Sequence, residues 1–339
     1  MTDIKNTILL IQQLASEWSW SEELLPIAKQ IVEDLSLESS ENYIEDAGDY
    51  FEKLGKRAKW EIKMEVIPTG FKDIDNRLYW AAIWEIMTIC ARTWVGKTTL
   101  WLNIALNMLE EHKVWFISLE MTKEDILDRI ISRECNIWLG TLTENYFREW
   151  DIENLKKYWA KAKEKIDKLI MAYNCFAIDD VIATIEIMAD EGCEAVFVDW
   201  LWMIDAPGGS RPEKMNIIMQ KLKAVAIWKH IAIITMQQLN RQMDSIARDE
   251  PELYDIADGS AVEKISSPVL ILRKNKDEKT DETYVSLFKT RRMSHDLKEQ
   301  CFQMAKEQDK KRQDLFFKIK LKDDLGHCSF RDYEWNKWF

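Results

Sequence analysis

The stretch ARTWVGKTTLWLNIALNM, residues 91–108, joins a predicted strand to a predicted amphipathic helix. Its first eight residues fit the phosphate-loop pattern G-x-x-x-x-G-K-[ST], except that Ala91 replaces the first glycine. Between a strand and a helix, this spacing lets backbone N–H groups converge on a phosphate at the positive helix end. A chance turn is the alternative. The predicted nucleotide contacts are Ala91, Arg92, Thr93, Trp94, Val95, Gly96, Lys97, Thr98 and Thr99.

Two side chains of this loop carry the chemistry of a nucleoside triphosphate site. Lys97 is expected to reach the β- and γ-phosphate oxygens, and the Thr98 hydroxyl is expected to bind Mg²⁺. The expected cofactors are therefore ATP and Mg²⁺. Trp94 is an unusual residue for such a loop, because the loop backbone must approach phosphate oxygens closely and an indole takes up that space.

Short β-branched runs alternate with longer helical runs between about residues 61 and 292. This alternation is typical of an α/β fold with a mostly parallel sheet and helices on its faces. The predicted strands are 85–91, 114–120, 168–173, 195–200, 231–236, 268–274 and 284–290. The predicted helices are 97–111, 123–136, 151–167, 178–191 and 213–228.

We expect the chain to have three parts. Residues 1–58 read as an N-terminal helical and linker region, whose last helix (41–58) is expected to dock on a neighbouring subunit. Residues 59–294 read as a P-loop ATPase domain. Residues 295–339 read as a charged and partly helical tail.

Composition excludes several classes of protein. A chain of 339 residues that is 47% hydrophobic and 31% charged is typical of globular proteins in water. No apolar run reaches about 18 residues and no signal-peptide pattern opens the chain, so we expect no membrane partner and a cytoplasmic location. Six scattered cysteines indicate neither a disulfide framework nor a zinc site. The net charge of −12 disfavours a surface that coats nucleic acid but allows a local basic channel.

Three polar residues lie at or just beyond the carboxyl ends of predicted strands, at the edge where open α/β sheets bind ligands. Asp199 ends an apolar strand and could complete the Mg²⁺ shell through water. Glu120 could orient and deprotonate an attacking water, and the Gln238 amide could sense the γ-phosphate. The alternatives are a helix cap or a surface carboxylate for Asp199, and the capping region of the next helix for Glu120.

The order of these motifs resembles the ATPase domain of DnaB-type replicative helicases. The resemblance covers about residues 64–292 and implies a RecA-like fold. After the entry segment VIPTGFKDID and the phosphate loop, the matching motifs are SLEM (118–121), VDWLWMI (198–204), QQLNR (237–241) and SLFKTRR (286–292). The segment PELYDIADGSAVEKISSPVLIL, residues 251–272, resembles the part of the family that contains its DNA-contacting loop.

The resemblance also implies roles for single residues. Glu120 matches the catalytic glutamate, while Lys289 and Arg291 match the pair that reaches the neighbouring subunit's ATP, with Arg291 as the finger. A finger supplied to a neighbour implies a homo-oligomeric ring, expected to be a hexamer. The short N-terminal region fits a phage or mobile-element helicase, in a bacterial or phage-infected host cytoplasm.

DNA contacts are expected from two loops. PGGSRPEK (207–214) offers Arg211 and Lys214, for which a mobile surface turn is the alternative. By resemblance, Asp258, Gly259 and Ser260 match the DNA-contacting loop.

The functional hypothesis is an ATP-driven hexameric helicase that translocates on single-stranded DNA and unwinds forked duplex. A primase or a helicase loader is a candidate partner. The alternatives are a RecA-like recombination or strand-exchange ATPase and a catalytically silent ring that acts as a scaffold or loader.

Tryptophan is in surplus and glycine is scarce. The chain has 16 Trp and 10 Gly, whereas an average glycine content of roughly 7% would give about 24 in a chain of this length. Trp80, Trp84 and Trp94 all occupy positions where the family pattern has glycine. We hypothesise that the source reads TGA codons as glycine, so that these residues are glycines in the natural protein. Genuine tryptophans that stack on a base or close a dead site are the alternative.

Overall fold

The computed structural model describes residues 66–78, 81–240, 253–257, 259–274, 282–289 and 318–332. The chain divides into two units, Met1–Met64 and Glu65–Phe339, and every described residue belongs to the second. The predicted N-terminal region 1–58, with its helix 41–58, lies outside the described residues and stays a prediction. Of the helices in the described part of the chain, none is long and apolar enough to cross a membrane.

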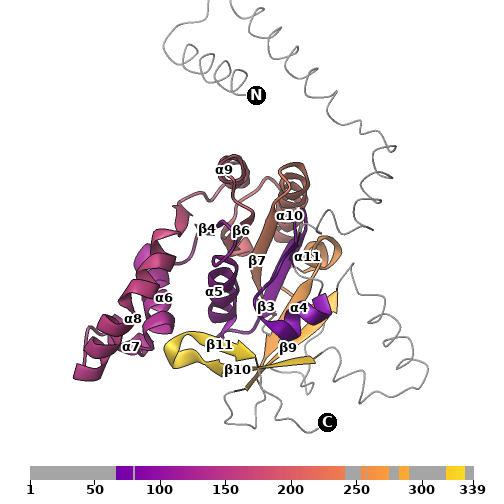
Figure 1. Cartoon of the computed structure of the whole chain (residues 1–339). Helices are drawn as coiled ribbons and strands as arrows, with labels where there is room; N and C mark the ends of the chain where they lie inside the picture. Colours follow the sequence, from indigo (N-terminus) through magenta and orange to yellow (C-terminus); the bar gives the residue numbers. More distant parts are fainter. Residues whose placement is uncertain are drawn as a thin grey trace, which may run out of the picture. The chain divides into compact units, whose positions relative to one another are not determined.

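A nine-stranded sheet forms the middle of the described unit, in the order β11-β10-β9-β8-β3-β7-β6-β4-β5 (Figure 1). The six neighbouring strands β8, β3, β7, β6, β4 and β5 run parallel to one another. Beyond β8, the strands β9, β10 and β11 extend the sheet with antiparallel pairing. The parallel strands are β3 (Ile86–Ala91), β4 (Val114–Ser118), β5 (Ile170–Tyr173), β6 (Ala195–Asp199), β7 (Ala232–Gln238) and β8 (Val269–Arg273). The remaining strands are β9 (Glu282–Lys289), β10 (Lys318–Asp324), β11 (Ser329–Asp332) and a separate pair, β1 (Val66–Ile67) with β2 (Ala81–Ala82).

The seven predicted strands and the mostly parallel α/β sheet are confirmed. Strands β3 and β6 are buried at every position, which explains their continuous apolar sequence in place of an alternating one. Because β3, β7, β6 and β4 are neighbours and run parallel, their carboxyl ends meet at one edge of the sheet.

Helices cover both faces of the sheet (Figure 1). The five predicted helices correspond to α5 (Lys97–Met108), α6 (Lys123–Cys135), α8 (Glu149–Asp167), α9 (Ile178–Asp190) and α10 (Arg211–Trp228). Within the described residues, three further helices are α4 (Lys72–Leu78), α7 (Leu139–Thr143) and α11 (Ser260–Ile265), and three 3₁₀ turns are η1 (Leu201–Met203), η3 (Leu253–Asp255) and η4 (Leu325–His327). The sequence did not predict these because elements this short show too few turns for a helical period to be recognised.

The side chains of β3, β4, β6, β7 and β8 alternate between two hydrophobic cores. One core packs against α5, where the fully buried Trp101 contacts Phe116 and Phe197 with ring centroids 5.0 and 5.3 Å apart. The other core packs against α9 and α10. Helix α5 is buried along most of its length, and it holds the phosphate loop at its N-terminus.

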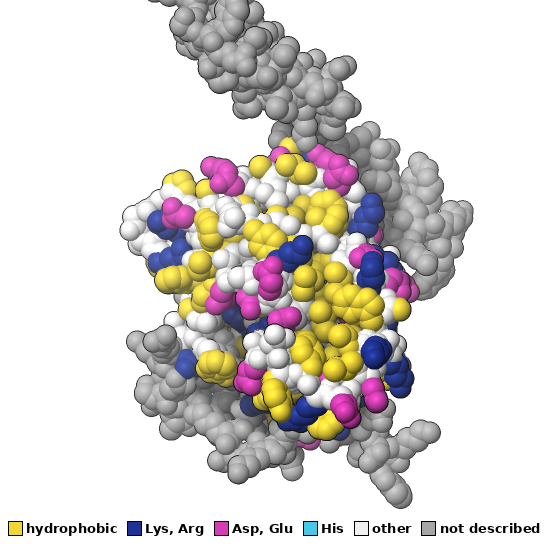
Figure 2. All heavy atoms as spheres, turned by 90° about the vertical axis from the view of Figure 1, so that its left-hand side faces the viewer, with side chains coloured by type: hydrophobic (Ala, Val, Ile, Leu, Met, Phe, Trp, Pro, Cys, Tyr) yellow, Lys and Arg dark blue, Asp and Glu magenta, His cyan; other side chains and the backbone are white. Residues whose placement is uncertain are grey.

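Helices α6, α7 and α8 form a side of the unit with its own small core of Cys135, Ile137 and Ala162. A buried carboxylate, Glu134, joins α6 to α8 through Lys165 at 3.1 Å. Figure 2 shows exposed hydrophobic side chains among charged ones on this side of the molecule. The large exposed side chains of α7, α8 and their flanks are Trp138, Tyr146, Phe147, Trp150, Ile152 and Trp159.

The C-terminal segment differs from the predicted tail. Residues 318–332 form β10, η4 and β11, a hairpin that extends the central sheet, whereas we expected a charged and partly helical tail over 295–339. The hairpin packs its alternate residues Ile319, Leu321 and Phe330 into the core beside α5. In residues 318–322 the apolar residues alternate with lysines, which is the period-2 pattern of a strand. The high average charge of the segment made this alternation easy to miss.

Candidate active site

The phosphate loop runs from the end of β3 at Ala91 to the start of α5 at Lys97. Its base is tied to the neighbouring β7 segment, since Leu239 N donates to Ala91 O at 3.2 Å and Arg92 Nη1 donates to Asn240 O at 2.7 Å. Gly96 caps α5 with a φ of 99°, which glycine adopts at little cost. The predicted strand–loop–helix setting is therefore present, with Thr98 in the first turn of α5.

Two tryptophans have the same left-handed backbone as the glycines of this region. Trp94 in the loop has a φ of 69° and is 92% exposed, and Trp84 in the turn before β3 has a φ of 71°. A positive φ is a genuine outlier for a bulky side chain. Trp80 lies outside the described residues.

Lys97 projects from the first residue of α5 into a largely buried site. Burial lowers the pKa of its ammonium, while the carboxylates of Asp199 and Glu120 act in the opposite direction. The Lys97 Nζ atom lies 4.7 Å from the centre of the Trp200 ring, a distance typical of a cation–π contact. The lysine predicted to bind phosphate thus shares its site with both predicted carboxylates.

Asp199 ends β6 and is buried. The pKa of its carboxyl is raised to about 7, chiefly by burial and also by the charge of Glu120, while Lys97 and Arg129 oppose the shift. Its Oδ1 atom has no hydrogen-bond partner among the described residues. A buried carboxylate oxygen without a donor is well suited to a cation, and Mg²⁺ is commonly held by one or two carboxylates together with phosphate oxygens. Asp199 and the Thr98 hydroxyl therefore fit the predicted Mg²⁺.

Glu120 lies two residues beyond the end of β4, and its side chain is exposed. The capping of α6 falls to other residues: Thr122 is the N-cap, with Asp125 N donating to Thr122 Oγ1 at 3.2 Å. The helix-cap alternative for Glu120 is therefore not supported. Its carboxylate is close enough to Lys97 and Asp199 to shift the pKa of both.

Gln238 is the last residue of β7 and pairs in register with Ala91 at the base of the loop. Its side chain is half-buried. The preceding Gln237 is fully buried and donates from Nε2 to Ala257 O at 2.9 Å, so it has a structural role. Of the two glutamines, Gln238 is the one whose side chain is not part of the core.

Several predicted site residues are not brought to this edge by the described structure. Lys289 ends β9, with only its backbone described, and Arg291 and Asp258 lie outside the described residues. Gly259 and Ser260 cap and begin α11. The roles predicted for these residues stay predictions.

Arg211 and Lys214, the predicted basic residues of the loop after β6, both have partners. The Arg211 guanidinium donates to the carbonyls of Leu201 and Ile204 at 3.3 Å and lies over the Trp202 ring at 4.8 Å. Lys214 Nζ is 2.7 Å from Asp205 Oδ1. The mobile-turn alternative is not supported, because these contacts hold the loop to the start of α10.

Sequence reasoning did not assign a role to two residues at this site, Trp200 and Arg129. Trp200 follows Asp199 directly, so its position beside a strand end was a usable signal. Arg129 lies within α6 and lowers the pKa of Asp199, but one arginine on a mixed-charge helix carries no sequence signal.

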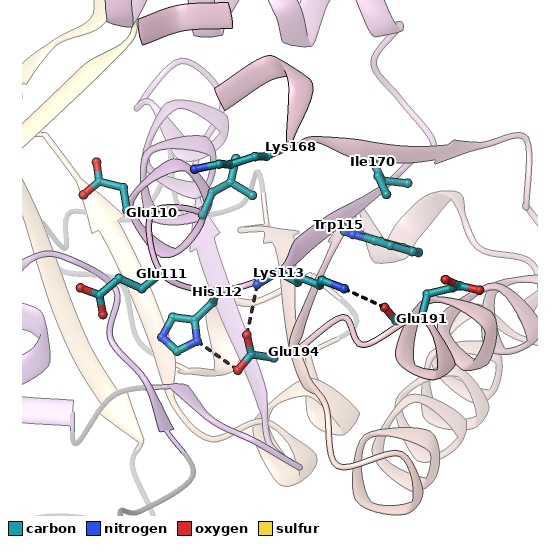
Figure 3. Close-up of a pocket in the computed structure, with 10 residues that line it drawn as sticks. Glu110, Glu111, His112, Lys113, Trp115, Lys168, Ile170, Glu191 and Glu194 are labelled. Atoms are coloured by element: carbon teal, nitrogen blue, oxygen red, sulfur yellow. Dashed lines mark hydrogen bonds and ion pairs between the residues drawn. The ribbon is translucent and has the colours of Figure 1, made fainter. Parts of the chain in front are cut away.

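A hollow of about 630 Å³ lies at the opposite edge of the sheet, where β4, β5 and β6 begin (Figure 3). His112 Nδ1 lies 3.1 Å from Glu194 Oε1, and Lys113 donates from Nζ to Glu191 O at 3.2 Å. His112, Lys113 and Glu194, three polar residues of the lining, thus already have hydrogen-bond partners within the protein. Because Lys97, Glu120 and Asp199 lie where the strands end, this hollow is separate from the candidate active site.

Comparison with known proteins agrees with this geometry. Residues 66–311 match the DnaB-like helicase C terminal domain. The chain belongs to this family. A probable plasmid replicative DNA helicase of Chlamydia muridarum is 26% identical over 229 residues, which make up 66% of this chain and 50% of that protein. This DnaB-like chain thus spans half the length of that relative.

Two solved structures share the fold. The first is an ATPase domain, which has a TM-score of 0.71 at 18% identity; the match covers 86% of this chain and 100% of that domain. The second is a DnaB-like replicative helicase, solved in a study of its interactions with primase. Its TM-score is 0.68 at 18% identity, and the match covers 97% of this chain and 76% of that chain. The predicted RecA-like α/β fold is confirmed. The DnaB-like match ends at residue 311, before the β10–β11 hairpin.

Proposed function

We propose that this chain is a subunit of an ATP-dependent DNA helicase ring, expected to be a hexamer, that translocates on single-stranded DNA and unwinds forked duplex. The observation that supports this most directly is that Lys97, Asp199 and Glu120 share one site beside the phosphate loop. Family membership supports the coupling of this site to DNA unwinding. A plasmid replicative helicase among the relatives supports a mobile-element origin.

In the proposed reaction, water attacks the γ-phosphorus of ATP, the bond to the β–γ bridging oxygen breaks, and ADP and phosphate leave. The exposed carboxylate of Glu120 orients this water and takes its proton. Lys97 neutralises charge on the β- and γ-phosphate oxygens, and the Gln238 amide senses the γ-phosphate. Mg²⁺, held by Thr98 and Asp199, would supply further neutralisation of the phosphate charge.

The site is completed by a neighbouring subunit in this proposal. Lys289 is the last residue of β9 and Arg291 comes two residues later. Both would reach the nucleotide of the adjacent subunit, where the Arg291 guanidinium stabilises the negative charge that develops on the transferred phosphoryl group. Single-stranded DNA would lie in the ring channel, and Arg211, Lys214, Asp258, Gly259 and Ser260 are its candidate contacts. A primase or a loader is the candidate protein partner, by analogy with the helicase solved for its interactions with primase.

The test is Mg²⁺-dependent ATP hydrolysis with and without single-stranded DNA. Lys97→Ala should lose nucleotide binding and turnover, because the main phosphate-neutralising charge is gone. Glu120→Gln should keep nucleotide binding and lose about 10²- to 10⁴-fold in turnover, the usual contribution of a positioned base. The matched control is Glu111→Gln, an exposed carboxylate at the opposite sheet edge, which should behave as wild type. Undiminished turnover in both site variants would contradict the proposal.

A silent ring that acts as a scaffold or loader is the second candidate, and Trp94 is the observation that favours it. An indole at positive φ within the phosphate loop competes with nucleotide for space. Measurable ATP turnover would exclude this candidate. A strand-exchange ATPase is distinguished separately, because it would hydrolyse ATP without displacing a strand from a forked duplex.

A further inference from the structure

The C-terminal hairpin contacts the phosphate loop through its turn. A Cβ built on Gly96 would lie 2.8 Å from Leu325 Cδ2 and 3.2 Å from Phe330 Cζ, so both side chains press against the Gly96 backbone. Phe330 is buried in the same core as α5, and Leu325 packs against that core. The residue before the phosphate-binding Lys97 is therefore backed by two hairpin side chains.

A buried polar contact fixes the hairpin to α5. Asn103 is fully buried and donates from Nδ2 to Thr99 O at 2.7 Å and to Cys328 O at 2.8 Å. Its Oδ1 accepts from Phe330 N at 3.1 Å. Because a buried amide without partners is costly, these bonds set one specific position of β11 on the helix.

The other strand of the hairpin is joined to β9. The register pairs Lys318 with Ser286 at one end and Lys322 with Glu282 at the other. The buried Asp323 accepts from Thr283 Oγ1 at 2.6 Å and reinforces this pairing. Strand β9 ends two residues before Arg291, which is proposed above as the finger for the adjacent subunit.

We propose that the hairpin is a positioning element that couples nucleotide at a subunit's own phosphate loop to β9, the strand that precedes its finger residue in the chain. Leu325, Phe330 and Asn103 are its positioning residues; the coupling role rests on the proposed function. Packed side chains behind Gly96 transmit a shift of the loop, because a close-packed interior leaves little free volume to absorb it. The β10–β9 hydrogen bonds then carry the shift toward Arg291. By reciprocity, finger engagement changes nucleotide affinity at the subunit's own site.

The experiment measures Mg·ADP affinity and amide hydrogen exchange in the full chain. In wild type, Mg·ADP should slow exchange in residues 318–332 and 282–289 as well as in the loop. Leu325→Ala should weaken Mg·ADP binding by about fivefold or more, the lower range of allosteric coupling, and remove the nucleotide effect on 282–289. Leu325→Met should restore both, because it refills the space behind Gly96.

Leu321→Ala is the control for a general loss of packing. Leu321 is fully buried in β10 of the same hairpin, and the three atoms nearest a Cβ built on Gly96 belong to Leu325 and Phe330, so this variant should lose stability yet keep wild-type Mg·ADP affinity. If Leu325→Ala does not fold, Leu325→Val is used in its place. The hydrogen-exchange measurement on the wild-type chain tests the coupling even if no variant folds.

The outcomes separate the two proposals. Mg·ADP that binds and protects the loop while exchange in 282–289 and 318–332 is unchanged overturns the coupling and leaves the proposed ATPase standing. Equal affinity losses in Leu321→Ala and Leu325→Ala also overturn it, since the effect would then be general. A wild-type chain that binds neither Mg·ADP nor Mg·ATP would overturn both proposals.

Discussion

Lys97 and Asp199 carry opposite charges in one buried site, and each favours the charged form of the other. Burial acts against both, since it lowers the pKa of Lys97 and raises the pKa of Asp199 to about 7. Without a cation, Asp199 therefore gains a proton near neutral pH, whereas an ordinary aspartate does so near its usual pKa of 3.8.

Mg²⁺ binding should depend on pH in a range set by Asp199. A metal ligand must be deprotonated, so a proton competes with Mg²⁺ below pH 7 and should weaken its binding by about tenfold per pH unit. The measurement is a Mg²⁺ titration of ADP binding between pH 5.5 and 8.5. Asp199→Asn should bind Mg²⁺ more weakly at pH 8 and keep only the pH dependence of the nucleotide itself. An Asp199→Asn profile parallel to wild type would exclude Asp199 as the titrating ligand.

Arg291→Ala should assemble normally and lose turnover, because the finger acts on the neighbour's nucleotide. We expect a loss of about 10³- to 10⁵-fold, the range typical of arginine fingers. Mixing provides a sharp test: Lys97→Ala subunits still supply a finger, and Arg291→Ala subunits still bind nucleotide. Rings mixed from the two inactive variants should regain part of the ATPase activity. Mixed rings as inactive as their parents would mean that Arg291 does not act across subunits.

Lys214 can contact DNA only after leaving Asp205, which it approaches to 2.7 Å. Asp205→Asn should therefore strengthen single-stranded DNA binding, and Lys214→Ala should weaken it and reduce the salt dependence by about one phosphate contact. Fluorescence anisotropy of a labelled oligonucleotide at several salt concentrations measures both. DNA affinity unchanged in both variants would remove Lys214 from the channel. Arg211→Ala is less informative, because this side chain holds the Leu201–Ile204 turn.

The sequence predicted the elements whose signals are local. A strand, a loop of fixed spacing and a helix were enough to place Lys97 and Thr98, and apolar strand ends were enough to place Asp199 and Glu120 at one edge. The partners of Arg211 could not be predicted in this way. They are backbone carbonyls of a 3₁₀ turn, and any sequence can supply these.

The hairpin was missed for a different reason. Ile319 and Leu321 alternate with lysines, so average charge dominates the segment, and its partner β9 lies about 30 residues earlier in the chain. Strand pairing at that separation depends on tertiary packing more than on local preference. The contact between Leu325 and Gly96 follows from that pairing and has no sequence signal of its own.

The backbone at Trp84 and Trp94 agrees with the hypothesis that these positions are glycines in the natural protein. Their φ values of 71° and 69° lie in the left-handed region. The other described residues with positive φ, glycine aside, are Asn136, Asn145, Asn174, His230 and Cys328, and asparagine tolerates that region. Trp84 cannot relax easily, because its N–H donates to Ile231 O at 3.1 Å and its carbonyl accepts from Lys223 Nζ at 2.7 Å.

Replacement by glycine should therefore stabilise the fold at Trp84 and strengthen ATP binding at Trp94. This is the reverse of the usual effect of removing a tryptophan. A non-glycine residue at left-handed φ costs roughly 1–2 kcal/mol, so Trp84→Gly should raise the free energy of unfolding by about that amount. Trp94→Gly should tighten ATP binding by freeing space beside the loop N–H groups. The control is Trp159→Gly in the interior of α8, which should destabilise by about 1 kcal/mol because glycine weakens helices. Urea unfolding measures the change in stability, and ATP titration measures the change in nucleotide binding.

The gene offers an independent test, because the recoding hypothesis predicts TGA codons at positions 80, 84 and 94. TGG codons at these positions would end the recoding hypothesis, and Trp94→Gly without gain in ATP binding would leave the silent ring as the better-supported function.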